Sequence, residues 1–495
     1  MKKIHENEEL YMKHIHRFSA LLLTLLLTAQ LTSCGSAEVQ ETAQTTDPTA
    51  AVETVAETVD DGKAHDDLGD ITFDGQEFHM WLAYEELTGY NMEEQTGEVF
   101  DDAVFDRNLA VEERLDVKLT FTASEHDFGG GGYAKGCEDI KNYVLSNDTT
   151  YDVYQQVQHS GIPGLIAEGY FVDWKTVPNV NLTKPYWHLN AIEEINFGSK
   201  IYMLTGFYEN SIMSSQSCVY FNKNILTDAQ VEFPYDAVLD GTWTYDKFME
   251  IIHGTARDLN GDGKMELKND LYGYVGRLWN SPYAMFISMG GDMLAKGEGN
   301  IPVDVINTER NIDIVDRILA LENPSEGTCI ISDTQEMIRM FHDSETATIH
   351  GELRYSYENF RDMDDDFGFV PPPKFDEKQE GYHSWIRHSA PLSYIPITNT
   401  DLAFTGAVLE ILAMESFNRV TPAYFDTVLT AKIARDTQSE AMIPVILECA
   451  SFYDHVLTTP DIVTCFEQKK GLATEYAKYQ TSVATLLEEL TEIYS

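Results

Sequence analysis

Apolar and polar positions alternate where the chain first becomes rich in large apolar residues. Phe78, Met80 and Leu82 alternate with His79 and Trp81, a period of two that predicts a strand. Apolar side chains then recur at helical spacing over residues 101–115, and alternation returns after them at residues 117–121. Strand, helix and strand at this spacing predict a βαβ unit, and therefore an α/β fold.

Shorter patterns predict further elements. A helix is predicted to begin at Thr244, whose hydroxyl suits the N-cap, and Phe248, Ile251 and Ile252 give that helix an apolar face. The later chain is predicted to be mostly helical, and no internal repeat of fixed period is visible. Additional strands are predicted near residues 151–154, 198–203, 347–349 and 367–370.

The N-terminal pattern is of another kind. A basic stretch precedes an apolar run at residues 20–27, which is too short to cross a bilayer, and small residues stand directly before Cys34. This order resembles the bacterial lipobox, so we expect residues 1–33 to be a lipoprotein signal peptide and Cys34 to carry the lipid. A plain signal peptide that ends nearby and translation from Met12 are the alternatives.

Composition separates a linker from the folded part. Residues 34–69 are acidic, polar and poor in large apolar residues, so we expect a disordered linker there. Removing residues 1–33 from 495 leaves 462, enough for two domains, and 43% of the chain is hydrophobic. The net charge of −48, from 34 basic and 82 acidic side chains, would repel nucleic acid. Six widely spaced cysteines without a CxxC motif argue against a disulfide framework.

One segment has the spacing of a calcium-binding loop. Side-chain oxygens recur at the first, third and fifth positions from residue 258, and a glycine at the sixth permits a tight turn. The final acid comes one residue later than in an EF-hand loop, so the loop must bulge or take its last ligand from elsewhere. A turn rich in Asx and glycine that binds no ion is the alternative. The predicted ligands of a structural calcium ion are Asp258, Asn260, Asp262, Lys264 through its carbonyl, Glu266 and Asp270.

Sequence motifs of enzymes are missing. The chain contains no HExxH, no nucleophile elbow, no phosphate-binding loop and no dinucleotide fingerprint. A pair of catalytic carboxylates, as in glycoside hydrolases, has no local signature among the 82 acids. We therefore predict that the protein is not an enzyme, with a surface glycoside hydrolase as the alternative.

Several stretches, taken in order, resemble the family 1 extracellular solute-binding proteins, the lipoprotein receptors of carbohydrate ABC importers. Residues 96–108 resemble the N-terminal-lobe segment of a Firmicutes branch, and residues 241–248 resemble its "GxWTxDxF" helix start. Residues 220–226 are similar to the "YNKxxL" stretch of maltose-binding protein and its relatives. Residues 345–348 and 367–371 stand where such proteins carry their "ETAM" and "YGVxxLP" strands.

This resemblance implies a two-lobed periplasmic-binding-protein-like fold of type 2, with mixed sheets flanked by helices and a ligand cleft at the hinge. The N-terminal lobe is expected over residues 70–208 plus 393–420, and the C-terminal lobe over residues 212–386 plus 421–495. The chain is expected to cross between the lobes near residues 207–215, 384–394 and 419–423.

Receptors of this kind stack sugar rings on aromatic side chains and bind the hydroxyl groups with polar ones. Some candidates follow predicted strands, where an α/β sheet offers its ligand crevice. Others stand near the expected crossings, and one pair, Arg354 and Tyr355, occupies the place of an aromatic pair in maltose-binding relatives. The predicted ligand-binding residues are Trp81, Tyr84, Glu85, Gln156, Gln158, His159, Tyr208, Glu209, Trp279, Arg354, Tyr355 and Trp385.

The implied function is that of a monomeric, lipid-anchored receptor on the extracellular face of the cell membrane. It would capture a carbohydrate, with an oligosaccharide favoured, or another small polar ligand, and deliver it to the permease subunits of an ABC transporter. A surface sugar-binding lipoprotein without a transporter is a further alternative.

Overall fold

The computed structural model describes residues 62–83, 89–90, 92–126, 131–158, 161–387, 389–430, 437–452 and 462–494. The chain divides into two units, Met1–His65 and Asp66–Ser495, and everything below concerns the second unit. The predicted signal peptide, Cys34 and most of the predicted linker lie outside the described residues.

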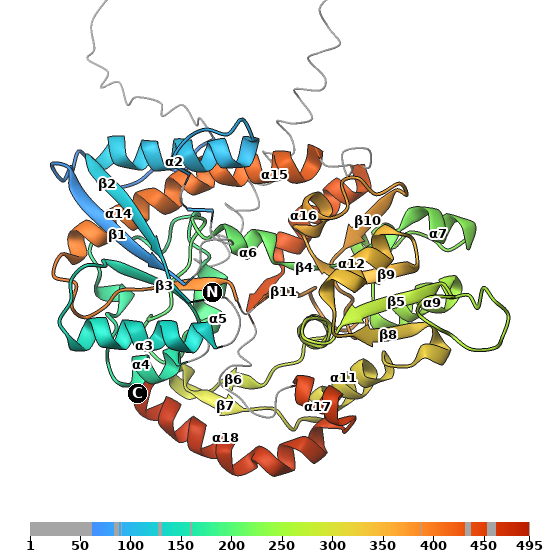
Figure 1. Ribbon diagram of the computed structural model, residues 1–495. Helices are drawn as coiled ribbons and strands as arrows, with labels where there is room; N and C mark the ends of the chain where they lie inside the picture. Colours follow the sequence, from blue (N-terminus) through green and yellow to red (C-terminus); the bar gives the residue numbers. More distant parts are fainter. Residues whose placement is uncertain are drawn as a thin grey trace, which may run out of the picture. The chain divides into compact units, whose positions relative to one another are not determined.

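The unit contains two large sheets, and each forms the centre of one lobe (Figure 1). In the first sheet, three strands are parallel and the fourth, β12, runs antiparallel to β3. The predicted βαβ unit is confirmed, because β1 and β2 pair in parallel and α2 joins them. In the order β12-β3-β1-β2, the strands are β12 (Pro391–Tyr394), β3 (Val153–Val157), β1 (Gln76–Leu82) and β2 (Val117–Ala123).

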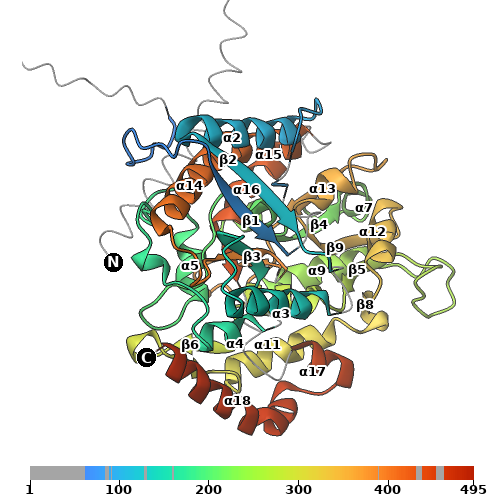
Figure 2. The same ribbon diagram turned by 60° about the vertical axis from the view of Figure 1, so that its left-hand side comes forward.

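Helices cover both faces of the first sheet, as the two views of the ribbon show (Figures 1 and 2). On one face, α2 buries Val104, Val111 and Leu115 and packs on α14. On the other, α3 packs against β3 and α4 against α3. These helices are α2 (Val99–Leu115), α3 (Gly132–Leu145), α4 (Ile162–Ala167), α5 (Leu189–Ile195) and α14 (Leu402–Glu415).

The second sheet is mixed and has five strands. β5 is parallel to both β8 and β9, whereas β4 is antiparallel to β9 and β10. The strands predicted near residues 347–349 and 367–370 are confirmed as β9 and β10, and β4 lies between them. In the order β10-β4-β9-β5-β8, the strands are β10 (Phe367–Val370), β4 (Ser217–Asn222), β9 (Thr346–Glu352), β5 (Tyr272–Arg277) and β8 (Thr328–Ile331).

The helices of the second lobe include the one predicted from Thr244. The Thr244 hydroxyl accepts a hydrogen bond from the Lys247 amide, and Phe248, Ile251 and Ile252 are buried, so both the N-cap and the apolar face are confirmed. The helices of this lobe are α7 (Lys223–Asp228), α8 (Tyr235–Leu239), α9 (Tyr245–Thr255), α10 (Ser281–Ser288), α11 (Glu309–Ala320), α12 (Thr334–His342) and α13 (Tyr355–Glu358).

Several elements connect the two lobes. α6 (Asn210–Ser214) lies between β3 of the first sheet and β4 of the second along the chain, and β11 (Ser384–Ile386) precedes β12. β11 pairs with β13 (Ala450–Phe452), and β6 (Leu294–Lys296) with β7 (Pro302–Asp304). The last segments are the π-helix η4 (Ser416–Val420), α15 (Thr421–Thr430), α16 (Thr437–Glu448), α17 (Ile462–Gln468) and α18 (Leu472–Tyr494).

The C-terminal segments belong to both lobes. α16 packs on β10 of the second sheet, whereas α15 packs on α2 of the first lobe. α18 begins against α17 and α11, and at its end the ring of Tyr494 lies 5.8 Å from that of Phe197 in the first lobe. The division of the chain into lobes at the residues expected from the sequence stays a prediction.

The strand predicted at residues 198–203 is wrong. The segment starts with a turn, and its residues 201–203 are buried, but side chains rather than a neighbouring strand bind the amides of these three residues. Asn196 Oδ1 accepts hydrogen bonds from the amides of Tyr202 and Met203, and Asp173 Oδ1 accepts one from Ile201.

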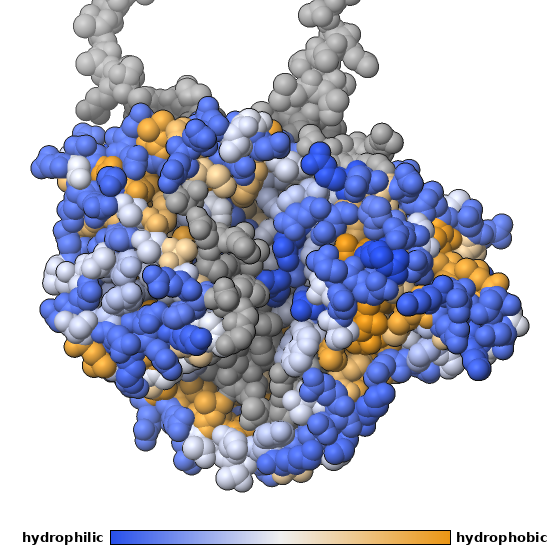
Figure 3. Space-filling view, in the orientation of Figure 1, coloured by the Kyte–Doolittle hydropathy of each residue, from blue (hydrophilic) through white to orange (hydrophobic). Residues whose placement is uncertain are grey.

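The surface agrees with the composition. Hydrophilic side chains dominate the face drawn in Figure 3, with apolar side chains in smaller areas. Within the described residues, no helix has the length and apolar character needed to cross a membrane.

Candidate functional site

Two adjacent parallel strands of the second sheet end in charged residues. β5 ends at Arg277 and β9 ends at Glu352. Because the carboxyl ends of parallel strands meet at one edge of a sheet, these two residues belong to the same edge, where α/β proteins place their ligands. This edge is the centre of the candidate site.

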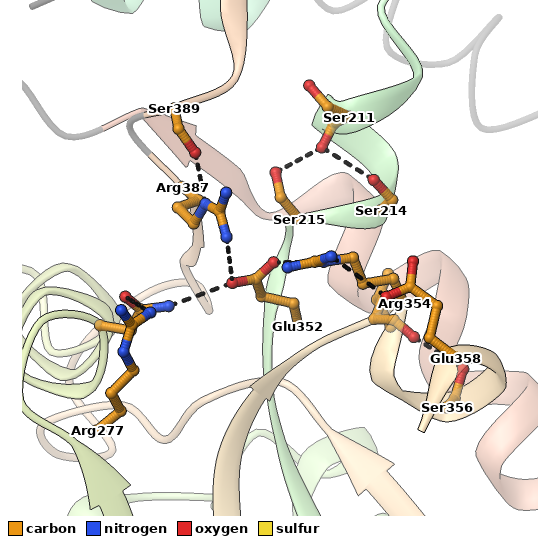
Figure 4. Close-up of polar contacts among 12 residues, drawn as sticks. Ser211, Ser214, Ser215, Arg277, Glu352, Arg354, Ser356, Glu358, Arg387 and Ser389 are labelled. Atoms are coloured by element: carbon orange, nitrogen blue, oxygen red, sulfur yellow. Dashed lines mark hydrogen bonds and ion pairs between the residues drawn. The ribbon is translucent and has the colours of Figure 1, made fainter. Parts of the chain in front are cut away.

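Glu352 is a buried carboxylate with three donors around it (Figure 4). Its Oε2 accepts a hydrogen bond from Arg354 Nε at 2.8 Å. Its Oε1 accepts hydrogen bonds from Arg387 Nη1 at 3.3 Å and from Asn280 Nδ2 at 3.2 Å. The four residues come from the end of β9, the segment after β11 and the turn after β5, so the site joins three distant parts of the chain.

The arginines keep Glu352 ionised. Burial acts to raise the pKa of this carboxyl, but the charges of Arg387 and Arg354 together outweigh burial, and its pKa is lowered. A buried charge is tolerated when it is both paired and hydrogen-bonded, and Glu352 meets both conditions. The side chains of Arg354 and Arg387 are themselves only 18% and 13% exposed.

Arg277 lies on the opposite side of Glu352 from Arg354 (Figure 4). Its Nη1 donates a hydrogen bond to Asn280 Oδ1 at 3.1 Å, and its Nε is a buried donor without a hydrogen-bond partner in the described residues. Within that same set of residues, Arg277 forms no ion pair. The site therefore holds a third guanidinium group whose charge no carboxylate contacts directly.

The first lobe faces this cluster through α3. Burial raises the pKa of the Tyr133 hydroxyl, and the charge of Arg387 partly opposes this effect, which places Tyr133 near Arg387. Gln156 Nε2 donates to the Tyr133 carbonyl oxygen at 3.4 Å. Trp81 and Gln156 both approach Gly136 so closely that a side chain there would collide with them. The carboxyl ends of β1 and β3 therefore lie next to α3, the helix that carries Tyr133.

The first crossing, α6, is tied to both lobes. Glu209 caps its start, because Glu209 Oε1 accepts from the Ser211 amide at 3.0 Å, while Oε2 accepts from the Tyr90 hydroxyl at 3.0 Å. At its end, the Ser214 carbonyl oxygen accepts a hydrogen bond from the Arg354 amide at 3.0 Å. Figure 4 shows the serines of α6 beside Glu352. A rotation at this crossing would therefore move the residues around Glu352.

The structure describes nine of the twelve predicted ligand-binding residues. Tyr84, Glu85 and His159 lie outside the described residues. Trp279, in the turn between Arg277 and Asn280, is 43% exposed, more than any of the other eight. The remaining residues are buried or half-buried, namely Trp81, Gln156, Gln158, Tyr208, Glu209, Arg354, Tyr355 and Trp385.

Several of these buried residues already have protein partners. The sequence suggested that Gln156 follows a strand, but Gln156 lies inside β3. The Tyr208 hydroxyl is 2.6 Å from Ser393 Oγ, and both carboxylate oxygens of Glu209 accept hydrogen bonds. Arg354 and Tyr355 lie at the site, with the guanidinium carbon of Arg354 5.5 Å from the centre of the Tyr355 ring. Contact of these residues with a ligand stays a prediction.

Sequence reasoning missed Glu352, Arg387, Arg277 and Asn280. A signal existed, because Glu352 stands two residues before the predicted pair at 354–355, and Arg387 and Arg277 each stand two residues from a predicted tryptophan. The sequence search favoured aromatic residues after strands. Charged residues that end apolar strands would have identified Arg277 and Glu352.

The predicted calcium loop is organised by hydrogen bonds. Asp258 accepts from the amides of Gly261 and Gly263, both at 2.7 Å, and Asp270 accepts from those of Leu259 and Glu266. In the part of the chain that the structure describes, no three His, Cys, Asp or Glu side chains are placed to hold a metal ion. Calcium binding by this loop stays a prediction.

Comparison with known proteins gives structural relatives only. No family model matches the chain, and no curated protein matches its sequence. The solved structures include a cyclic α-maltosyl-1,6-maltose binding protein from Arthrobacter globiformis, with a TM-score of 0.56 and 13% identity over 84% of this chain and 99% of that one. An ABC substrate-binding protein from Listeria monocytogenes in complex with cycloalternan gives 0.53 and 12%, covering 84% and 100%.

A third similar structure binds a different kind of solute. It is UgpB from Mycobacterium tuberculosis in complex with glycerophosphocholine, with a TM-score of 0.54 and 12% identity over 84% of this chain and 98% of that one. At these identities the likeness concerns the fold. The chain has the fold of the two-lobed, periplasmic-binding-protein-like solute-binding proteins of ABC transporters.

Proposed function

We propose that this protein is the solute-binding receptor of an ABC importer, with a carbohydrate as its ligand. One observation carries the proposal. The ends of β5 and β9 meet α3 and α6 around the Glu352 cluster, which consists of Glu352, Arg277, Asn280, Arg354 and Arg387. The fold is shared with such receptors. The proposed ligand position lies between the lobes, and closure around the ligand would follow from its contacts with both of them.

The residues suit the task in two ways. Trp279, in the turn between Arg277 and Asn280, is exposed, and aromatic faces stack on the apolar face of a sugar ring. The guanidinium and amide groups of Arg277, Arg354 and Asn280 supply hydrogen-bond donors for oxygen atoms of a ligand.

The membrane attachment is part of the same proposal. Lipidation of Cys34 would hold the receptor at the extracellular face of the membrane, close to the permease subunits that accept its ligand. Metabolic labelling with a fatty-acid analogue tests this step, and Cys34→Ala is expected to abolish the label and release the protein from the membrane.

Calorimetry against a panel of oligosaccharides tests the receptor. Binding of at least one glycan with micromolar affinity, without change to the glycan, is expected. Trp279→Ala should weaken that affinity about tenfold, because stacking contributes about 1 kcal/mol or more. Trp174→Phe, a change in the buried core, is the matched control and should leave affinity unchanged. Hydrolysis of a glycan, or no binding across the panel, would contradict the proposal.

A further inference from the structure

We infer that the solute carries an anionic group, a carboxylate or a phosphoryl group, which binds at the guanidinium cluster formed by Arg277, Arg354 and Arg387. This inference rests on the proposed function and narrows the class of ligand. A neutral sugar alone would use the cluster only as a set of hydrogen-bond donors.

The placement of the three arginines is the first argument. The chain has 34 basic side chains against 82 acidic ones, so positive charge is scarce. Nevertheless three guanidinium groups from distant segments surround the single buried carboxylate of Glu352 (Figure 4). In a protein with a net charge of −48, an anionic solute needs such a local concentration of positive charge in order to bind.

The pairing of these groups is the second argument. Glu352 is shared between Arg354 and Arg387, and Arg354 Nη1 also contacts Glu358 at 3.2 Å. Neither Glu352 nor Glu358 lies within ion-pair distance of Arg277. The only side-chain hydrogen bond of Arg277 among the described residues is the one to Asn280. The cluster thus holds one more positive charge than its own acids balance.

The buried Nε of Arg277 is the third argument. Leaving a buried donor without a partner destabilises a protein, and this donor has no hydrogen-bond partner in the described residues. A planar or tetrahedral oxyanion accepts hydrogen bonds from a guanidinium fork with two oxygens at once and neutralises its charge. A hydroxyl group of a neutral sugar would accept only one of these bonds and leave the charge unbalanced.

The surroundings indicate a ring next to the anion. Trp279 stands two residues from Arg277 and is 43% exposed, and the ring of Tyr355 lies beside the Arg354 guanidinium. The charge of Arg387 also acts on the hydroxyl of Tyr133 in the first lobe. An acidic sugar, with an apolar ring face and a charged substituent, fits both kinds of group.

Two matched pairs of probes test the inference by calorimetry at low salt. Trigalacturonate is compared with its methyl ester, and glucose 6-phosphate with glucose, so that each pair differs in charge but not in carbon skeleton. The acidic member of at least one pair is expected to bind at least tenfold more tightly. The pair that responds tells whether the charged group is a carboxylate or a phosphate.

Arg277→Gln connects the preference to the cluster. This variant should reduce the tenfold preference to less than twofold, because it removes the charge that no carboxylate pairs with in the described residues. The affinity for the acidic member should therefore fall much more than the affinity for the neutral member, which loses only hydrogen-bond donors. Arg317→Gln is the matched control, since Arg317 pairs with the exposed Asp246, and it should keep the preference. If Arg277→Gln does not fold, Arg277→Lys keeps the charge without the fork and should give an intermediate preference.

The outcomes separate this inference from the receptor proposal. Equal binding of both members of each pair, or a preference that survives Arg277→Gln, would overturn the inference. If only neutral oligosaccharides bind, the receptor proposal stands and the anionic group is wrong. If neither these probes nor the oligosaccharide panel binds, both proposals fail together.

Discussion

Two buried glutamates stand at opposite ends of α6, the short helix between the two sheets along the chain. Glu209 caps its first turn and binds Tyr90 of the first lobe. Glu352 ends β9 of the second lobe, next to the Arg354 amide that binds the last turn of α6. Both carboxyl groups are almost fully removed from solvent, so burial alone predicts the same behaviour for both.

The partners make the two carboxyl groups different. Glu209 is bound by the neutral donors Tyr90 and Ser211, and burial raises its pKa to about 7. The guanidinium of Arg107 contacts Ser416 and the Tyr90 carbonyl instead, and it forms no ion pair within the described residues. Glu352 has two arginines within 3.3 Å, and its pKa is lowered despite burial. A cation at hydrogen-bond distance, rather than the degree of burial, therefore decides the charge.

The largest expected effect comes from the same substitution at both positions. Glu352→Gln should reduce the free energy of unfolding by about 3 kcal/mol, since it leaves two poorly solvated arginines without their counter-charge. Glu209→Gln should change it by no more than about 1 kcal/mol at pH 5.5, where the carboxyl of Glu209, with a pKa of about 7, is protonated and resembles a neutral amide. Urea-induced unfolding at pH 5.5 measures both values.

Glu358→Gln serves as the control for this pair of variants. Glu358 also contacts Arg354, but its side chain is 41% exposed, so its removal should cost less than about 1 kcal/mol. Equal losses for Glu352→Gln and Glu209→Gln would mean that the arginines do not set the difference between the two sites.

A smaller effect is expected in the pH dependence of stability. The pKa of Glu209 is raised to about 7 in the folded state from an ordinary value near 4.5, so the folded state holds its proton more tightly than the unfolded state. Its contribution is present below about pH 4.5 and is lost as pH rises through about 7. Relative to Glu209→Gln, the wild type should lose about 2 kcal/mol between pH 5 and pH 8.

Glu352 should show the opposite sign. Its folded pKa is lowered, so its contribution is present above the ordinary glutamate value and is lost as pH falls through the folded value. The stability difference between the wild type and Glu352→Gln should shrink below about pH 4.5. Stability curves that stay parallel for the wild type and Glu209→Gln from pH 5 to pH 8 would contradict the assignment for Glu209.

Much of the fold could be predicted from local sequence patterns. β1 and α2 are amphipathic, because each has one face on a core and one nearer to solvent, so their periods are visible in the sequence. β3 and β4 are buried on both faces and give no alternation. The false strand at residues 198–203 has the pattern of a strand, but Asn196 and Asp173 bind its amides in place of a partner strand.

The candidate site could be predicted only in part. Trp279, Arg354 and Tyr355 were found because aromatic and polar residues after strands are a recognisable local signal. The other residues of the cluster, namely Glu352, Arg277, Asn280 and Arg387, were missed. They are spread over more than a hundred positions and meet only through the pairing of β5 with β9 and the return of the chain at β11. Pairing between distant strands is a property of the fold, and it produces no fixed spacing of residues in the sequence from which the site could be predicted.

The smallest expected effect concerns the acidic side chains of residues 258–270. Unlike Glu352, which pairs with two arginines, these acids form no ion pair in the described residues. The carboxylates of Asp258 and Asp270 are satisfied by backbone amides, and the predicted calcium ion would have to compete with those hydrogen bonds. At a calcium concentration ten times the dissociation constant, the stabilisation would be about 1.4 kcal/mol, a rise of a few degrees in the melting temperature. Asp262→Ala should abolish this rise, and magnesium, which demands a stricter octahedral geometry, should give less of it. Equal melting in calcium and in chelator would show that hydrogen bonds alone are enough to hold the loop, as neutral donors do at Glu209.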